Sequence, residues 1–492
     1  MDRHRLPCWR SLAALALMGA PSAAFAHSFG QVYNLPVPVW LYLYGAAAAL
    51  ILSFVVVGYF ATESDNEHPA HGIELGESLG VRLLRRIRLT GLLRIVAVLM
   101  LVLCIVSGLF GTRNAYGNFN MTFFWVVFIL GLGYFTAICG DSYAVLSPWR
   151  TLADLIGRFW GSYARGRLRY PPWLGYWPAL LLYMGFVWIE LFGNTRPYSL
   201  SVILAVYTVL NLIGVWLLGK TAWFRYCEFL AVYFRLLAKA APIEYRPREP
   251  GSGRLRLRWP FSGLLEERAD SISLLLFVLF MLSSTAFDGL HETVIWMRWF
   301  WLDIYKSLTP WISPNPFLAY PTLRKLYLGY QTTALVLSPF LYLMVYLLFV
   351  WLAKHAARST LPLRVLALRF TYSLIPIALV YNITHYYTLL LTQGPKIISL
   401  ASDPLGRRWD LFGTAGWFRA PFIPDMGTVW NVQVGLIVLG HMVSVYLAHV
   451  EALRLFPKRS QAIASQLPML LLMVLFTTAG LWILSQPIKP GA

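Results

Sequence analysis

Apolar runs long enough to cross a membrane recur ten times along this chain of 492 residues, and they constrain its fold more than any other feature. About 20 residues of helix are needed to cross roughly 30 Å of hydrocarbon. The composition agrees, because 58% of the residues are hydrophobic and only 13% are charged. The sequence therefore predicts an all-α, polytopic transmembrane helix bundle. Its spans should lie near residues 38–60, 89–110, 121–140, 174–193, 201–219, 271–288, 327–353, 365–391, 429–450 and 467–485.

Residues 1–26 have the three parts of a secretory signal peptide. Arg3, Arg5 and Arg10 form a basic segment, "SLAALALMGA" is a short apolar core, and residues 24–26 read Ala-Phe-Ala, a typical cleavage site. An uncleaved first anchor is the alternative, but this apolar core is too short to span a bilayer. We expect a mature chain that begins at His27 and forms one transmembrane domain over residues 27–492.

The formal charge of +19 is explained better by membrane topology than by a nucleic-acid partner. With the mature N-terminus outside, the five inside loops carry 25 Lys and Arg, and the outside loops and tail carry 11. The positive-inside rule thus predicts that both termini lie outside, with the bilayer as the partner of the basic flanks. The basic inside loop 220–270 contains "WFRYCEFLAVYFRLLAK", which is typical of an amphipathic helix on the inner membrane surface.

Two outside loops, 289–326 and 392–428, are unusually long. Both are rich in aromatic residues, which argues against disorder, and we expect them to fold over the outer mouth of the bundle. Ten spans could also divide into two inverted sets of five, as in some transporters. Neither half, however, shows the Gly- or Pro-broken pair of helices that this plan requires.

Few ionisable residues lie inside the spans, and such residues are functional by default. Asp288 and His291 share a helix face, as do Asn382 and His385, and His441 lies near mid-membrane on a third helix. If these faces meet, Asp288, His291, His385 and His441 could form a divalent metal site of the zinc or manganese type. The alternative is that the histidines only donate hydrogen bonds between helices and that Asp288 caps its helix.

His27 offers a separate metal site, because an N-terminal histidine presents its amine and imidazole together. Such a pair suits copper on the outer surface, and a copper-handling or other metal-handling permease is therefore the alternative to an enzyme. Copper sites in membranes usually recruit sulfur ligands, and the methionines of the outer segments are scattered.

Several long stretches resemble a family of bacterial multi-span membrane proteins whose members are often labelled fenitrothion hydrolase. They are "AHSFGQVYNLPVPVWLYLYGAAAALILSFVVVG", "STAFDGL", "HYYTLLL", "SDPLGRRWDLFGT", "GHMVSVYLAH" and "SQLPMLLLMVLFTTAGLWIL". The resemblance covers nearly the whole mature chain. It implies a multi-pass protein of the bacterial inner membrane that hydrolyses organophosphorus triesters.

Hydrolysis of such a small apolar substrate would suit a membrane-embedded site, because a neutral aryl triester partitions into bilayers. A bound metal commonly generates hydroxide for this reaction. Asp288, His385 and His441 would be its ligands, and the carboxylates of Asp403, Asp410 and Glu190 would act as base or orient the ligands. A nitrophenolate leaves readily, so that no strong general acid is required.

Overall fold

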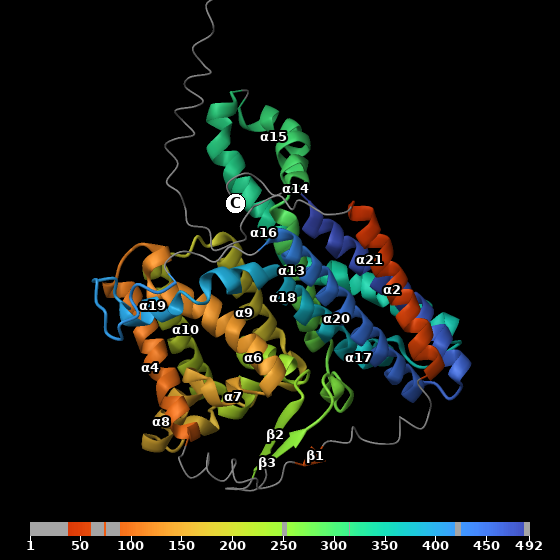
Figure 1. Ribbon diagram of the computed structural model, residues 1–492, viewed down its shortest axis with the longest axis horizontal. Coiled ribbons are helices and arrows are strands. Elements are labelled where there is room, and N and C mark those ends of the chain that lie inside the picture. The colour runs from red at the N-terminus through yellow and green to blue at the C-terminus, as the bar shows by residue number, and fades with distance from the viewer. Residues whose placement is uncertain are drawn as a thin grey trace, which may run out of the picture.

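A computed structural model describes residues 38–60, 73–74, 89–247, 253–313, 315–418 and 425–486. The signal sequence and His27 lie outside the described residues. Within them, ten helices are long and apolar enough to cross a membrane, which confirms the predicted polytopic bundle (Figure 1). The spans are α2 (Val39–Phe60), α4 (Leu89–Phe110), α5–η3–α6 (Phe119–Cys139), η5–α9 (Pro172–Phe192), α10 (Pro197–Leu218), α13 (Ile272–His291), α16 (Pro316–Ala356), α17–η9–α18 (Leu363–Gln393), α20 (Met426–Leu455) and α21 (Arg459–Ser485).

Three spans form the centre of the bundle. The apolar windows of α13, α17–η9–α18 and α20 are 78%, 72% and 67% buried, whereas that of α4 is only 11% buried. A helix that is apolar on all sides can be placed either inside the protein or against lipid, so hydropathy alone does not distinguish the two. The three central helices carry 15 of the 34 buried polar side chains among the described residues.

Two spans are interrupted, and the interruptions lie in the interior. The π-helix η3 (Thr122–Gly131) lies between α5 and α6, and the 3₁₀ turn η9 (Thr371–Leu374) precedes α18. Pro376, in the first turn of α18, lacks an N–H group and leaves an upstream carbonyl without its helical donor. The Ser444 hydroxyl of α20 donates to the nearby Ser373 carbonyl at 2.5 Å. The structure thus contains helix breaks that the sequence pattern did not indicate.

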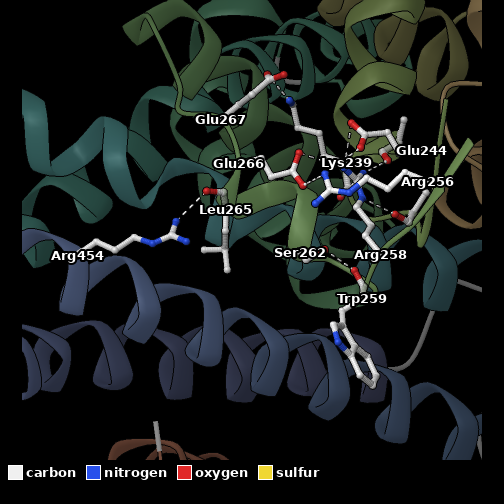
Figure 2. A network of polar contacts seen from close by, with 12 residues as sticks. Lys239, Glu244, Arg256, Arg258, Trp259, Ser262, Leu265, Glu266, Glu267 and Arg454 are labelled. Atoms are coloured by element: carbon white, nitrogen blue, oxygen red, sulfur yellow. Dashed lines mark hydrogen bonds and ion pairs between the residues drawn. The ribbon is translucent and has the colours of Figure 1, made fainter. Parts of the chain in front are cut away.

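The loops predicted to be inside lie together at one end of the bundle. Ile73 of β1 (Ile73–Glu74) pairs with Leu257 of β3 (Gly253–Leu257), which also pairs with β2 (Ile243–Pro247) in a small sheet of order β1–β3–β2. Figure 2 shows the ion-pair network beside this sheet, in which Arg256 and Arg258 face Glu244 and Glu266. Residues from the first and third inside loops are therefore on the same side, as the alternation of spans requires.

The amphipathic segment of loop 220–270 does not lie on the membrane surface as predicted. Its helix α12 (Phe229–Ala238) is packed inside the bundle and exposes only parts of Tyr233 and Arg235. It follows α11 (Lys220–Ala222) and η6 (Trp223–Cys227). The Arg258 guanidinium donates to the carbonyls of Ala238, Lys239 and Ala241 at the end of α12. These bonds give the last carbonyl groups the hydrogen-bond donors that a helix end lacks. The backbone at the end of α12 can therefore lie in the interior.

At the opposite end, the two long loops differ in structure. In Figure 1, α14 (Val294–Arg298), η8 (Trp299–Ile304), α15 (Tyr305–Ile312) and the start of α16 form a helical projection that stands beyond the bundle. The side chains of Trp311 and Phe317 are each 88% exposed there. At about 1.5 Å per residue, α16 is roughly twice as long as the hydrocarbon layer is thick, so its first turns extend beyond the bundle. Loop 289–326 includes these turns and is therefore not a lid over the outer mouth.

Loop 392–428 does cover part of this end. Its helix α19 (Ile397–Ser402) packs beside α5 and η3, and the Thr112 N–H group donates to the Leu405 carbonyl at 3.0 Å. The ammonium group of Lys396 is buried, lies 3.4 Å from the centre of the Tyr116 ring and donates to Gln393. Burial lowers the pKa of Lys396 to about 8. The described part of this loop thus closes the end of the α4–α5 pair.

Candidate functional site

Four polar side chains from three spans meet near the ends of α9 and α13. Nε2 of His385 lies 2.6 Å from Oδ2 of Asp288. The Tyr386 hydroxyl lies 3.1 Å from the same Asp288 oxygen and 2.8 Å from Oε1 of Glu190. Asp288 is 2% exposed, and the His385 side chain is 16% exposed. We call Glu190, Asp288, His385 and Tyr386 the carboxylate cluster.

The hydrogen bonds at Tyr386 limit where protons can lie in this cluster. A tyrosine hydroxyl carries one proton, so it can donate to only one of the two carboxylates. The other short contact is a hydrogen bond only if that carboxyl group is protonated and donates to the phenol oxygen. A shared proton also reduces the repulsion between two buried acids. The arrangement of Glu190, Tyr386 and Asp288 therefore fits one extra proton held between two acids.

A small cavity adjoins the cluster. Its volume is about 40 Å³, and Glu190, Asp288, Asn382 and Tyr386 contribute to its wall. Since one water needs about 10–15 Å³ of such volume, the cavity has room for about three waters. Pockets for small organic ligands are usually about 300–1,000 Å³. The site as it stands thus fits water or protons rather than an aryl triester.

The π-helix η3, which interrupts its span, also contributes to the wall of this cavity. Ile129 and Leu130 of η3 line it. One turn further, the Tyr134 hydroxyl on α6 donates to Oδ1 of Asn382 at 3.1 Å. Asn382 and His385 thus share the inward face of α18, as their spacing predicted. Stretches of π-helix are rare and occur often at functional sites, which makes η3 a candidate for local rearrangement next to the cluster.

His291 lies beside the cluster and supports the position of Asp288. Its Nδ1–H donates to the Asp288 backbone carbonyl at 2.7 Å and lies 3.8 Å from Oδ1 of the same residue. The ring stacks on Phe287, and Nε2 lies 3.5 Å from a carboxylate oxygen of Glu292. Asp288 is not a helix cap, because α13 continues to His291.

The predicted convergence of His441 with Asp288 and His385 is not found. The His441 ring is fully buried beside Tyr381, and its Nδ1–H donates to the Ile437 carbonyl of its own helix at 2.8 Å. Among the residues that the structure describes, no group of three or more His, Cys, Asp and Glu is arranged to hold a metal ion. His385 and His441 lie on adjacent helices, α18 and α20, but their rings have different partners: Asp288 for His385 and the Ile437 carbonyl for His441.

The other predicted site residues lie in different parts of the protein. Glu190 belongs to the cluster. Asp403 accepts from the N–H groups of Arg407 and Arg408, both at 2.8 Å, and Asp410 accepts from that of Ala415 at 2.9 Å. These aspartates shape the outer loop, and neither lines the cavity beside Asp288. His27 lies outside the described residues, and its copper site stays a prediction.

Sequence reasoning missed Tyr386 and a second buried acid, Glu228. Tyr386 is one of two tyrosines in "HYYTLLL", and nothing in the sequence indicates that its hydroxyl bridges two acids. Glu228 is fully buried before α12, where it accepts from the Leu230 and Ala231 N–H groups and from the hydroxyls of Tyr143 and Tyr207. Burial raises the pKa of the Glu228 carboxyl above its ordinary value. Its position directly before an apolar helix was the only available signal.

Comparison with known proteins leaves the geometry to carry the functional argument. No protein-family model matches the chain, and no curated protein and no solved structure matches it either.

Proposed function

We propose that this multi-pass membrane protein is a proton-linked transporter of a bacterial inner membrane, and that the carboxylate cluster is its proton-binding site. The observation that carries the proposal is the Tyr386 hydroxyl, which lies 2.8 Å from Glu190 and 3.1 Å from Asp288. Two acids bridged by a group with a single proton can release or take up one further proton without moving the backbone. Imidazole at His385 gives that proton a neighbouring acceptor.

The surroundings of the cluster support this role. Ionisable residues within spans are expensive to bury and mark ion pathways and proton relays. The cavity of about 40 Å³ can hold the few waters through which protons move. Interrupted helices near the membrane midplane are also a common feature of transporters, and η3 borders both the cavity and α18.

Proton flux through purified protein in liposomes tests the proposal. A potassium gradient with valinomycin would set the membrane potential, and a trapped pH-sensitive dye would report the flux. Asp288→Asn and Glu190→Gln keep the size of each side chain but remove an acid, so we expect either change to lower the flux at least about tenfold, the effect of about 1.4 kcal/mol.

Asp410→Asn is the matched control, because this exposed carboxylate shapes the outer loop away from the cavity. It should retain the full flux. Equal flux through Asp288→Asn and the unmodified protein, or no flux above protein-free liposomes, would contradict a proton-linked role.

Hydrolysis of organophosphorus triesters is the second candidate, and the Asp288–His385 pair is the observation that favours it. A carboxylate on one ring nitrogen orients an imidazole so that the other nitrogen can act as a general base. His385 could then take a proton from a water that attacks phosphorus, with nitrophenolate leaving. The described residues do not fit a bound metal, so water activation would depend on His385 itself.

Nitrophenol release from fenitrothion by purified protein tests this second activity. His385→Ala should lower the rate about a hundredfold or more, within the usual contribution of a general base, while Asp410→Asn should leave it unchanged. A chelator should have no effect if His385 acts alone. Undiminished release by His385→Ala would exclude this role for the pair.

A further inference from the structure

A second cavity opens at the end of the bundle that carries the basic loops. Its volume is about 740 Å³, within the range of small-molecule sites. Its wall comes from α8 (Pro148–Phe159), the residue before α9, α11, η6, α12, the segment before α13, the first turn of α13, and η9. Segments that are more than 200 residues apart, such as those of Arg150 and Tyr372, therefore meet around one space.

The wall of this cavity is strongly basic. Glu267 and Asp270 are its only acidic residues among those that the structure describes. Its basic residues are Arg150, Lys220, Arg225, Arg235, Lys239 and Arg268.

Among the residues that the structure describes, carboxylate partners of the basic wall residues are found for the two lysines alone. Lys239 pairs with Glu267, as Figure 2 shows, and Lys220 pairs with Asp154 outside the cavity. Asp270 accepts from the Tyr176 hydroxyl at 3.4 Å. Over the described part of the chain, the four arginines of the wall form no ion pair, although Arg150 is within electrostatic range of the buried Glu228. Arg225 and Arg235 are also within electrostatic range of Glu267. Six basic residues nevertheless face two acidic ones in the described wall, and this excess creates a local positive potential.

Backbone and ring contacts hold two of these arginines, Arg235 and Arg150, in place. Arg235 donates to the Arg225 carbonyl at 2.8 Å and to the Phe224 carbonyl at 3.4 Å. The Arg150 guanidinium lies 4.9 Å from the centre of the Phe224 ring, and its buried Nε–H has no hydrogen-bond partner. A buried donor left unpaired is unfavourable. The wall is thus preorganised and includes a donor that a bound acceptor would satisfy.

We propose that this cavity binds a phosphate-bearing anion. Guanidinium groups match phosphate oxygens in pairs and bind them by charge-assisted hydrogen bonds. The volume exceeds that of a single phosphate, and Phe224 and Tyr372 add apolar wall, so the ligand carries an organic part or a second phosphate. Such a group could belong to an anionic lipid whose headgroup enters from the bilayer, or to a soluble phosphate compound.

This site is separate from the carboxylate cluster but lies on the same central helix. Leu274, in the first turn of α13, lines the basic cavity, and Asp288 lies near the other end of that helix. At about 1.5 Å per residue, the two are roughly 21 Å apart along the helix. Anion binding at the cavity does not depend on proton transport at the cluster, and either one can fail without the other.

Titration with inorganic pyrophosphate tests the cavity. Isothermal calorimetry on purified protein in a neutral detergent would measure binding to the soluble probe. Arg150→Gln and Arg268→Gln should each weaken binding about tenfold, as expected for the loss of one charge-assisted hydrogen bond. Arg268 is exposed, so this variant should fold even if Arg150→Gln does not. Arg158→Gln, an exposed arginine of α8 outside the cavity, is the matched control and should bind as the unmodified protein does.

A second arm distinguishes the two sources of phosphate. The melting temperature would be compared in phosphatidylcholine nanodiscs with and without phosphatidic acid. Stabilisation by the anionic lipid that is lost in Arg268→Gln, without pyrophosphate binding, supports a lipid headgroup; pyrophosphate binding that is lost in the same variant supports a soluble ligand. The proposal is overturned if neither probe acts, or if the cavity variants respond as Arg158→Gln does.

Discussion

Glu228→Ala is expected to lower the free energy of unfolding by about 3 kcal/mol or more. The Glu228 carboxylate accepts from two N–H groups at the start of α12 and from the hydroxyls of Tyr143 and Tyr207, and it is fully buried. Each buried donor left without a partner is unfavourable by about 1–3 kcal/mol, and a lost N-cap alone by about 1 kcal/mol. Denaturation of purified protein in mixed detergent micelles, followed by circular dichroism, would measure the change.

Asp425→Ala is the matched control for this variant. Asp425 caps α20 in the same way, accepting from the Thr428 N–H group at 2.7 Å, but it is exposed, so water can replace it. The stability loss should be clearly smaller than for Glu228→Ala. Equal losses in the two variants would mean that the buried hydroxyl contacts of Glu228 contribute nothing.

The pH dependence of Glu228→Gln follows from the raised pKa of this carboxyl. As pH rises above the ordinary value of 4.5, the unfolded chain loses its proton before the folded chain does, so this group destabilises the folded state increasingly. Glutamine cannot titrate. The stability of Glu228→Gln relative to the unmodified protein should therefore rise with pH across that range and then become constant.

Asp288→Ala is expected to lower the free energy of unfolding by about 3–5 kcal/mol, the usual effect of removing one partner of a buried pair. It leaves His385 without its carboxylate at 2.6 Å and removes one acceptor of Tyr386. Asp288→Asn keeps an acceptor oxygen and should lose much less stability. That difference allows loss of proton flux to be separated from loss of folding, since Asp288→Asn should lower the flux at least about tenfold in a folded protein.

A double-mutant cycle distinguishes the observed cluster from the site predicted by sequence. Asp288→Ala and His385→Ala should be coupled by more than about 1 kcal/mol, because the two side chains are in direct contact. Asp288→Ala and His441→Ala should be additive within about 0.5 kcal/mol, because His441 bonds to Ile437 instead. Strong coupling of Asp288 with His441 would restore the predicted convergence.

Several features were determined by the sequence alone. Each of the ten predicted spans corresponds to a helix, because the need to cover about 30 Å of hydrocarbon is met by consecutive residues and can be read locally. The rarity of charge within spans singled out Asp288 and His385, which do meet. Spacing placed Asn382 and His385 on one face, because side chains three residues apart on a helix are neighbours.

The partners of these residues were decided only by the tertiary structure. His441 is fully buried and lies on an adjacent helix, yet its ring bonds to its own backbone. Tyr386 looked like any interfacial tyrosine. The helix α12 looked like a surface helix because its charged flanks are visible in sequence, whereas the bonds by which Arg258 satisfies the backbone carbonyls at its end are not. The bridge across Tyr386 and the basic cavity around Arg150 depend on how helices far apart in the chain rotate and pack. Hydropathy fixes which segments cross the membrane, but nearly uniform apolar surfaces leave the orientation of each helix to side-chain fit.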